Sequence, residues 1–293
     1  MSETAEPIFI VGVQHSGTTI LCRMLARHPD LAWFSQYSLR NGEIPGRKRL
    51  PFAGPINRTL RRLLPVPWRK SQRRLSALAP TPKDSDIWKI LLPQRKIFLD
   101  AEDNTPALSA AVRDIARREC VGWRKPRLLV KLPELARAVL LLDAIFPGAK
   151  FVHIVRDGKA VAPSLAPKFA GTPYGPGPAL LQAAAYWRDV MQYWQRCEKD
   201  IPDRVMTLRY EKLCDDVRGS IEEVLRFCDL PVRDFPLQQL PATIASTNAK
   251  RIAEYTPEER RQLDGILSAT LASLDYEPFF PEKAGPSSAP AGA

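Results

Sequence analysis

Two short segments of the chain carry residue types that bind anions. The first, residues 12–19, reads G-V-Q-H-S-G-T-T and follows the apolar residues 8–11. In the second, Arg156 directly follows another apolar run, and Ser164 lies eight residues further on. In an α/β fold, a loop between a buried strand and a helix presents free backbone N–H groups to a phosphate. Two such segments on one sheet predict a ligand with anionic groups at both ends.

The first loop differs from a loop that binds a nucleoside triphosphate. Such a loop has a lysine where Thr18 stands, because its ammonium group holds the β- and γ-phosphates. Backbone N–H groups and the hydroxyls of Ser16, Thr18 and Thr19 can still surround a phosphate. The segment is therefore suited to a smaller negative charge than a triphosphate carries. The alternative is an ordinary strand-to-helix turn.

Together, the two segments resemble those of the sulfotransferases that use 3′-phosphoadenosine-5′-phosphosulfate (PAPS) and release adenosine 3′,5′-bisphosphate (PAP). The resemblance covers residues 8–30, 127–168 and 204–231. The motif sequences are most similar to those of the tyrosylprotein branch and of the bacterial carbohydrate or lipid branches. The resemblance implies that the first loop binds the 5′-phosphosulfate and that Arg156 and Ser164 bind the 3′-phosphate. The first-loop residues concerned are Gln14, His15, Ser16, Gly17, Thr18 and Thr19.

Three further residues complete the nucleotide site that the resemblance implies. Tyr210, in the sequence Y-E-K-L, matches the family segment that lies against the adenine. Lys168 lies one helical turn beyond Ser164 and could add positive charge. Lys250 belongs to a small polar cluster near the C-terminus, where related enzymes close a loop over the nucleotide. For Lys250, an exposed loop residue is the alternative interpretation.

Sulfuryl transfer, like phosphoryl transfer, requires in-line positioning and stabilisation of the charge that develops on the leaving phosphate. Lys131 ends the predicted strand Arg127–Lys131, where ligands meet open α/β sheets. The family has a lysine at this place, which implies an electrostatic role in catalysis; the alternative is a salt bridge. The family usually has Lys or Arg where this chain has His15. A histidine could serve if it is protonated or donates a hydrogen bond, so its charge would depend on pH.

The general base is assigned only through the resemblance. Some branches use a histidine two residues after the strand lysine, but Pro133 occupies that position here. The tyrosylprotein branch uses a glutamate soon after the second strand, and Glu43 is the nearest match. Glu134 is the alternative base. Glu43 could equally be a solvated loop acid.

The predicted fold is α/β: a single P-loop-like domain over residues 1–283, with a central parallel sheet flanked by helices. A Pro-rich, irregular insertion is expected at about residues 38–106, after the second strand, and a disordered tail at 284–293. The predicted strands are 8–11, 31–37, Arg127–Lys131, Lys150–Val155 and Val205–Arg209. The predicted helices are 18–28, 105–119, 133–146, 157–165, 179–199, an amphipathic segment 220–228, and one that starts with Thr256 as its N-cap.

Charge and cysteine content indicate partners and location. The formal net charge is +11. Ten Lys and Arg residues, and no acidic residue, lie in residues 47–74. This segment could contact an anionic acceptor or a peripheral anionic membrane surface, or it could be a solvated insertion. No nucleic-acid motif accompanies it, so no nucleic acid is expected. Five cysteines without C-x-x-C spacing, and no signal or membrane segment, predict a cytoplasmic protein.

The expected activity is sulfuryl transfer from PAPS to a hydroxyl or amine of a carbohydrate, lipid or small-metabolite acceptor. No cluster of metal ligands is visible, and this chemistry needs no metal. A P-loop kinase or NTPase is one alternative, but it explains neither the missing lysine nor Arg156 with Ser164. A non-catalytic nucleotide-binding protein on the same fold is the other.

Overall fold

The computed structural model describes residues 5–35, 59, 96–171, 174–175 and 177–280. These residues form two compact units, which are described separately. The first contains the described residues up to Arg156 together with 193–246. The second contains residues 157–192 and those from Thr247 onward. That the chain is one domain over residues 1–283 remains a prediction, and the basic segment 47–74 and the tail 284–293 lie outside the described residues, apart from residue 59.

The first unit is built on a five-stranded sheet in which every neighbouring pair is parallel. The strands are β1 (Ala5–Val11), β2 (Leu31–Trp33), β3 (Arg127–Lys131), β4 (Lys150–Val155) and β5 (Val205–Arg209), in the order β2-β3-β1-β4-β5. The apolar runs of β1, β3 and β4 are almost fully buried, as strands covered on both faces must be. The predicted α/β class with a parallel sheet is therefore confirmed.

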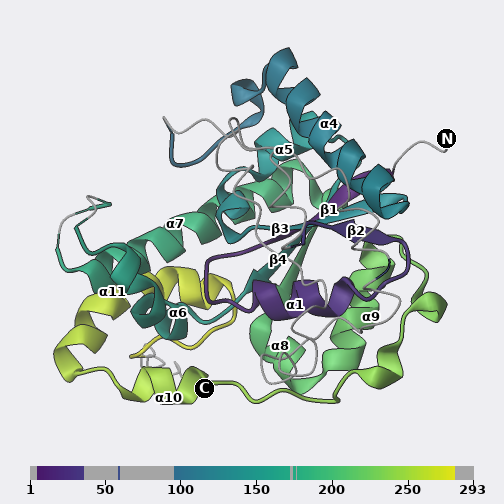
Figure 1. Ribbon diagram of the computed structural model, residues 1–293. Helices are drawn as coiled ribbons and strands as arrows, with labels where there is room; N and C mark the ends of the chain where they lie inside the picture. The colour runs from purple at the N-terminus through teal and green to yellow at the C-terminus, as the bar shows by residue number, and fades with distance from the viewer. Residues whose placement is uncertain (1–4, 36–58, 60–95, 172–173, 176, 281–293) are drawn as a thin grey trace, which may run out of the picture. The chain divides into compact units, whose positions relative to one another are not determined.

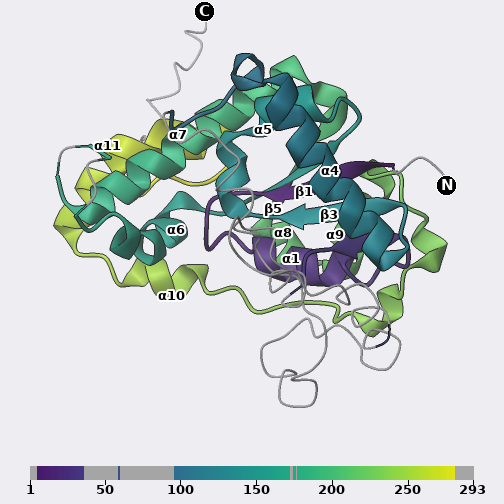
Figure 2. The ribbon, with the colours of Figure 1, turned by 45° about the horizontal axis from the view of Figure 1, so that its top comes forward.

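Helices cover both faces of this sheet. One face carries α1 (Thr18–Leu25), α8 (Tyr210–Asp215) and α9 (Val217–Phe227), and the other carries α4 (Pro106–Trp123) and α5 (Val139–Ile145) (Figure 1; Figure 2). In α1 the apolar residues Leu21, Met24 and Leu25 are all buried. Among the described helices, none combines the length and the apolar character that crossing a bilayer requires.

Several predicted boundaries were wrong, each for a local reason. The predicted helix 133–146 is two pieces, a 3₁₀ turn η4 (Pro133–Arg137) and α5, because Ala138 leaves the helical region at φ −135°. The predicted helix 105–119 runs on as α4 to Trp123, whose ring is buried, and ends where Arg124 becomes left-handed at φ 53°. Helix α1 stops at Leu25 rather than at residue 28, and within the described residues β2 stops at Trp33.

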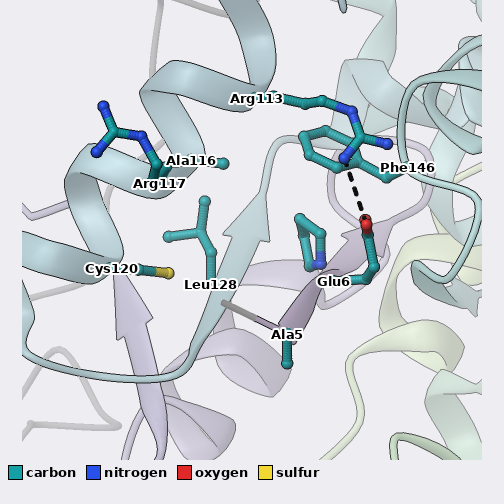
Figure 3. Close-up of a pocket in the computed structure, with 9 residues that line it drawn as sticks. Ala5, Glu6, Arg113, Ala116, Arg117, Cys120, Leu128 and Phe146 are labelled. Atoms are coloured by element: carbon teal, nitrogen blue, oxygen red, sulfur yellow. Dashed lines mark hydrogen bonds and ion pairs between the residues drawn. The ribbon is translucent and has the colours of Figure 1, made fainter. Parts of the chain in front are cut away.

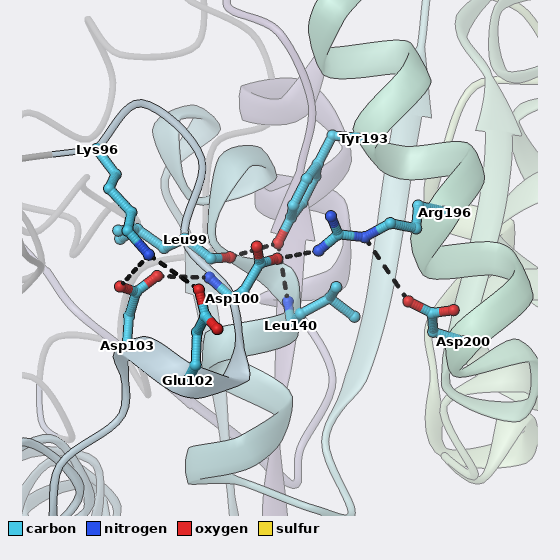
Figure 4. Close-up of polar contacts among 9 residues, drawn as sticks. All are labelled: Lys96, Leu99, Asp100, Glu102, Asp103, Leu140, Tyr193, Arg196 and Asp200. Carbon is cyan, nitrogen blue, oxygen red and sulfur yellow. Dashed lines mark hydrogen bonds and ion pairs between the residues drawn. The ribbon is translucent and has the colours of Figure 1, made fainter.

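A polar cluster fixes residues 96–103 within the first unit (Figure 4). The hydroxyl of Tyr193, on α7 (Ala179–Asp200), donates to the carbonyl of Leu99 at 2.7 Å and accepts from the amide of Leu140 at 3.1 Å. Asp100 pairs with Arg196, also on α7. These contacts hold the end of the predicted insertion against α5 and α7.

The second unit contains the helices that follow Arg156 and those of the C-terminal part. They are α6 (Gly158–Leu165), η5 (Ala166–Lys168), the first part of α7, α10 (Asn248–Ala253) and α11 (Pro257–Ser273). The predicted start of α11 is confirmed, because Thr256 accepts from the amide of Glu259 at 3.2 Å in a capping box. Three of the four aromatic residues of α7, namely Trp187, Tyr193 and Trp194, are buried, and Tyr186 is half-buried.

Candidate active site

Four adjacent strands of the first unit end beside one another at the carboxyl edge of the sheet. Lys131 ends β3, the loop of residues 12–17 follows β1, Arg156 follows β4 and Tyr210 follows β5. The register aligns these ends, since Ile10 pairs with Lys131. Ligands of open parallel sheets bind at this edge, where the direction of the strand connections reverses.

The loop after β1 has a backbone that only glycine accommodates easily at two places. Gly12 has φ 148°, and a β-carbon there would lie 2.6 Å from the carbonyl oxygen of Ile154. Gly17 has φ 100° and is the N-cap of α1, and as a glycine it has no side chain with which to cap the helix. His15 between them is left-handed at φ 72°. The loop therefore turns sharply and directs the amino end of α1 toward the carboxyl edge of the sheet.

The hydroxyl groups of this loop fit an anion. Ser16 is 1% exposed, and its Oγ has no hydrogen-bond partner among the described residues. A buried hydroxyl without a partner costs free energy, so this atom is suited to a ligand oxygen. Thr18 is also buried, at the start of α1. The residues present therefore fit the 5′-phosphosulfate of PAPS.

Arg156 connects three parts of this edge. Its Nη1 donates to the carbonyl oxygen of His15 at 2.8 Å, and its guanidinium carbon lies 4.5 Å from the centre of the Tyr210 ring. Arg156 is 7% exposed. A guanidinium over an aromatic face is favourable, and the N–H edge of a guanidinium is the part that binds oxygen anions. The structure thus brings together three of the predicted site residues, His15, Arg156 and Tyr210.

Tyr210 closes the other side of the loop. A β-carbon at Gly17 would lie 2.6 Å from Tyr210 Cδ2, so the ring rests directly on the glycine. Burial, together with a hydrogen bond to Cys214, raises the pKa of the Tyr210 hydroxyl to about 12. The side chain therefore stays neutral at physiological pH and offers a flat, uncharged surface.

Of the predicted catalytic residues, Lys131 and His15 lie among the described residues, whereas Glu43 does not. Lys131 is 7% exposed at the end of β3, as predicted, and it has partners there. The side chain of His15 is exposed, while its backbone carbonyl is held by Arg156. Glu43 lies outside the described residues, so its role as base stays a prediction. The alternative base, Glu134, is half-buried in the first turn of η4.

The remaining predicted nucleotide ligands belong to the second unit. Ser164 is half-buried on α6, and Lys168, at the end of η5, is exposed. Lys250 is exposed on α10, which packs against α6. Ser164 and Lys250 thus lie on neighbouring helices of one unit. Their joint action with the loop of the first unit remains a prediction.

Comparison with known proteins decides the family. Residues 7–234 match the sequence profile of the sulfotransferase family. This chain is a sulfotransferase-family member. It is 25% identical over 230 residues to a protein-tyrosine sulfotransferase of Drosophila melanogaster, covering 78% of this chain and 38% of that protein. It is 23% identical over 259 residues to protein-tyrosine sulfotransferase A of Caenorhabditis elegans, covering 86% of this chain and 58% of that protein. The chain thus spans less than two thirds of the length of either relative.

The fold of this sulfotransferase-family chain resembles that of solved sulfotransferases. The crystal structure of a sulfotransferase from Mycobacterium avium aligns with a TM-score of 0.59 at 15% identity, covering 94% of this chain and 78% of that one. Sequence reasoning found the strand-end residues but missed two contacts that organise them, Arg156 with His15 and Gly17 with Tyr210. No local signal could have revealed the first, because Arg156 and His15 are 141 residues apart.

Proposed function

We propose that this chain transfers a sulfuryl group from PAPS to a hydroxyl group of an acceptor. The observation that supports this most is the buried hydroxyl of Ser16, which has no hydrogen-bond partner in the part of the chain that the structure describes, beside the amino end of α1. In this proposal, the loop amides with Ser16 and Thr18 hold the 5′-phosphosulfate. Arg156 binds the 3′-phosphate, and Tyr210 lies against the adenine.

Lys131 supplies positive charge where it is needed during transfer. The acceptor oxygen forms a bond to sulfur while the bond between sulfur and the bridging oxygen of the 5′-phosphate breaks. Negative charge develops on that bridging oxygen, and a cation already in place lowers the barrier. The acceptor hydroxyl loses its proton to a carboxylate, for which Glu43 and Glu134 are the proposed bases. PAP then leaves.

For the acceptor, we propose the phenolic hydroxyl of a tyrosine in a protein. The names of the two curated relatives support this choice. The carbohydrate, lipid or small-metabolite acceptors expected from the sequence are the competing outcomes. The basic segment 47–74 would suit an acceptor with acidic neighbours.

The donor is tested by thermal unfolding with PAP, ADP or ATP–Mg²⁺ at equal concentrations. A ligand that binds only the folded state raises the midpoint, and about 2.7 kcal/mol is gained at 100 times Kd. A rise with PAP alone is expected. A rise with ATP–Mg²⁺ alone would favour a kinase or NTPase, and no rise with any of the three would favour a chain without a working donor site.

The acceptor is tested by transfer of labelled sulfate from PAPS. The panel contains a tyrosine peptide with acidic neighbours, the same peptide with phenylalanine in place of tyrosine, an oligosaccharide and a glycolipid. Label on the tyrosine peptide alone is expected. Label on the sugar or the lipid, with none on the tyrosine peptide, would contradict the proposed acceptor and leave the sulfotransferase activity standing.

A further inference from the structure

A cavity of about 180 Å³ lies at the opposite end of β1 from the loop of residues 12–17 (Figure 3). It lies between the start of β1, the middle of α4, Leu128 of β3 and Phe146 just after α5. All these elements belong to the first unit. Because a strand rises about 3.3 Å per residue, the cavity lies roughly 20 Å from the carboxyl edge. We call it the α4 cavity; nothing in the proposed transfer reaction uses it.

About half of the α4 cavity wall is apolar, and this half comes from α4, β3 and the residue after α5. Ala116 and Leu128 are buried, and Phe146 closes one side. Burial raises the pKa of the Cys120 thiol to about 12, so this wall residue stays uncharged. For scale, a protein cavity of about 150 Å³ lined by Leu, Ile and Phe holds benzene. The volume therefore fits a ligand with one six-membered ring and a short side arm.

One end of the cavity is polar, and its groups have unequal pairing. Glu6 Oε1 accepts from Arg113 Nη1 at 3.4 Å, whereas Glu6 Oε2 is buried and has no partner among the described residues. Arg113 also lies 5.2 Å from the centre of the Phe146 ring. Arg117 pairs with Asp114 at 2.7 Å. The arginines thus have partners. Glu6 Oε1, which accepts the 3.4 Å hydrogen bond from Arg113, can accept a further one, because a carboxylate oxygen has two lone pairs.

The charges around this end select the head group of the ligand. A cationic amine would satisfy Glu6 but would lie beside two guanidinium groups. A carboxylate would approach the arginines but would also meet the Glu6 carboxylate, a repulsive contact in a partly buried place. A neutral hydroxyl avoids both penalties and can donate a hydrogen bond to the Glu6 carboxylate.

We propose that the α4 cavity is a second binding site, for a small neutral alcohol with a single-ring apolar body, whose hydroxyl donates to Glu6. The site is distinct from the carboxyl edge, so its ligand and PAP bind at the same time.

The test uses the full chain and three fluorinated probes that share one ring: 4-fluorobenzyl alcohol, 4-fluorobenzylamine and 4-fluorobenzoate. Binding is followed by broadening of the ¹⁹F signal during titration. We expect the alcohol to bind at least fivefold more tightly than either charged probe, and saturating PAP to leave its Kd unchanged. Tighter binding of the amine or the benzoate, displacement by PAP, or no binding of the alcohol would overturn the proposal.

Two variants locate the binding. Ala116→Leu fills the cavity and is expected to abolish binding of the alcohol, whereas Ala111→Leu, on the exposed face of the same helix, should leave it intact. Glu6→Leu removes the acceptor oxygen at a half-exposed position and is expected to weaken binding of the alcohol at least tenfold. This second variant decides the outcome if Ala116→Leu does not fold. Unchanged binding in Glu6→Leu would contradict the assigned role of Glu6.

Discussion

The ring of Tyr210 lies directly on Gly17, so that a β-carbon on the glycine would stand 2.6 Å from Tyr210 Cδ2. Gly17 also holds φ 100°, which L side chains rarely adopt. The same ring lies under the guanidinium of Arg156, which donates to the carbonyl of His15. The turn before α1 is therefore held from two sides, by a ring from the end of β5 and by an arginine from the end of β4.

Gly17→Ala is expected to lose PAP binding. The added methyl group must displace the Tyr210 ring, and the residue must also keep a strained backbone, which together lower the free energy of unfolding by about 1–3 kcal/mol. The thermal midpoint with and without PAP measures both effects. Gly265→Ala is the control, because this glycine of α11 faces open space and its replacement should stabilise the helix slightly. A PAP response of ordinary size in Gly17→Ala would show that the turn does not bind the donor.

Arg156→Ala is expected to discriminate between PAP and adenosine 5′-phosphate, which lacks the 3′-phosphate. Loss of a charged partner should weaken the binding of PAP by a factor of ten or more, which is about 1.4 kcal/mol or more. The binding of adenosine 5′-phosphate should weaken far less. Isothermal titration of both nucleotides measures this difference. Arg226→Ala, an exposed residue of α9 whose side chain pairs with Glu222, should change neither affinity. Equal weakening of both nucleotides by Arg156→Ala would mean that Arg156 acts only by holding His15.

The strands of the site could be predicted from sequence, but its contacts could not. The bounds of β3, β4 and β5 agree with prediction. The runs of β3 and β4 are buried by the parallel sheet, and β5 is a short, half-buried strand at its edge. Their order follows from long-range pairing and is not written locally. The contact of Arg156 with His15 joins residues 141 apart, and only the sheet brings them together. The break at Ala138 was not predicted, because the apolar pattern of the sequence continues through this residue.

Lys131→Ala is expected to lower kcat far more than it weakens PAP binding. Charge on the leaving phosphate develops only during transfer, so removing the cation should cost about 100-fold or more in kcat. Single-turnover transfer from PAPS, beside PAP titration, separates the two effects. Lys131→Arg should restore part of the rate. As a control, Lys212→Ala removes an exposed ion pair with Glu223 and should leave the rate unchanged. If Lys131→Ala weakens PAP by the same factor as it lowers kcat, Lys131 serves donor binding rather than the transition state.

His153, in the middle of β4, should make the fold sensitive to acid. Its ring is fully buried, 4.4 Å from the Trp194 ring, and neither ring nitrogen has a hydrogen-bond partner among the described residues. Burial lowers the pKa of His153 from 6.5 to about 3. Above pH 6.5 the residue is neutral in both the folded and the unfolded state, so it adds no pH dependence there.

As the pH falls below 6.5, the unfolded state takes up a proton that the folded state refuses. The free energy of unfolding should therefore decrease by up to about 1.4 kcal/mol per pH unit, until the folded state is protonated near pH 3. Between pH 7.5 and 5.0 this amounts to about 2 kcal/mol. Urea unfolding at both pH values, with the natural chain and with His153→Phe, measures it. The phenylalanine variant has no group to protonate and should lose about 2 kcal/mol less over this interval. Equal losses in the two proteins would show that other groups set the acid sensitivity and that His153 is hydrated in the folded state.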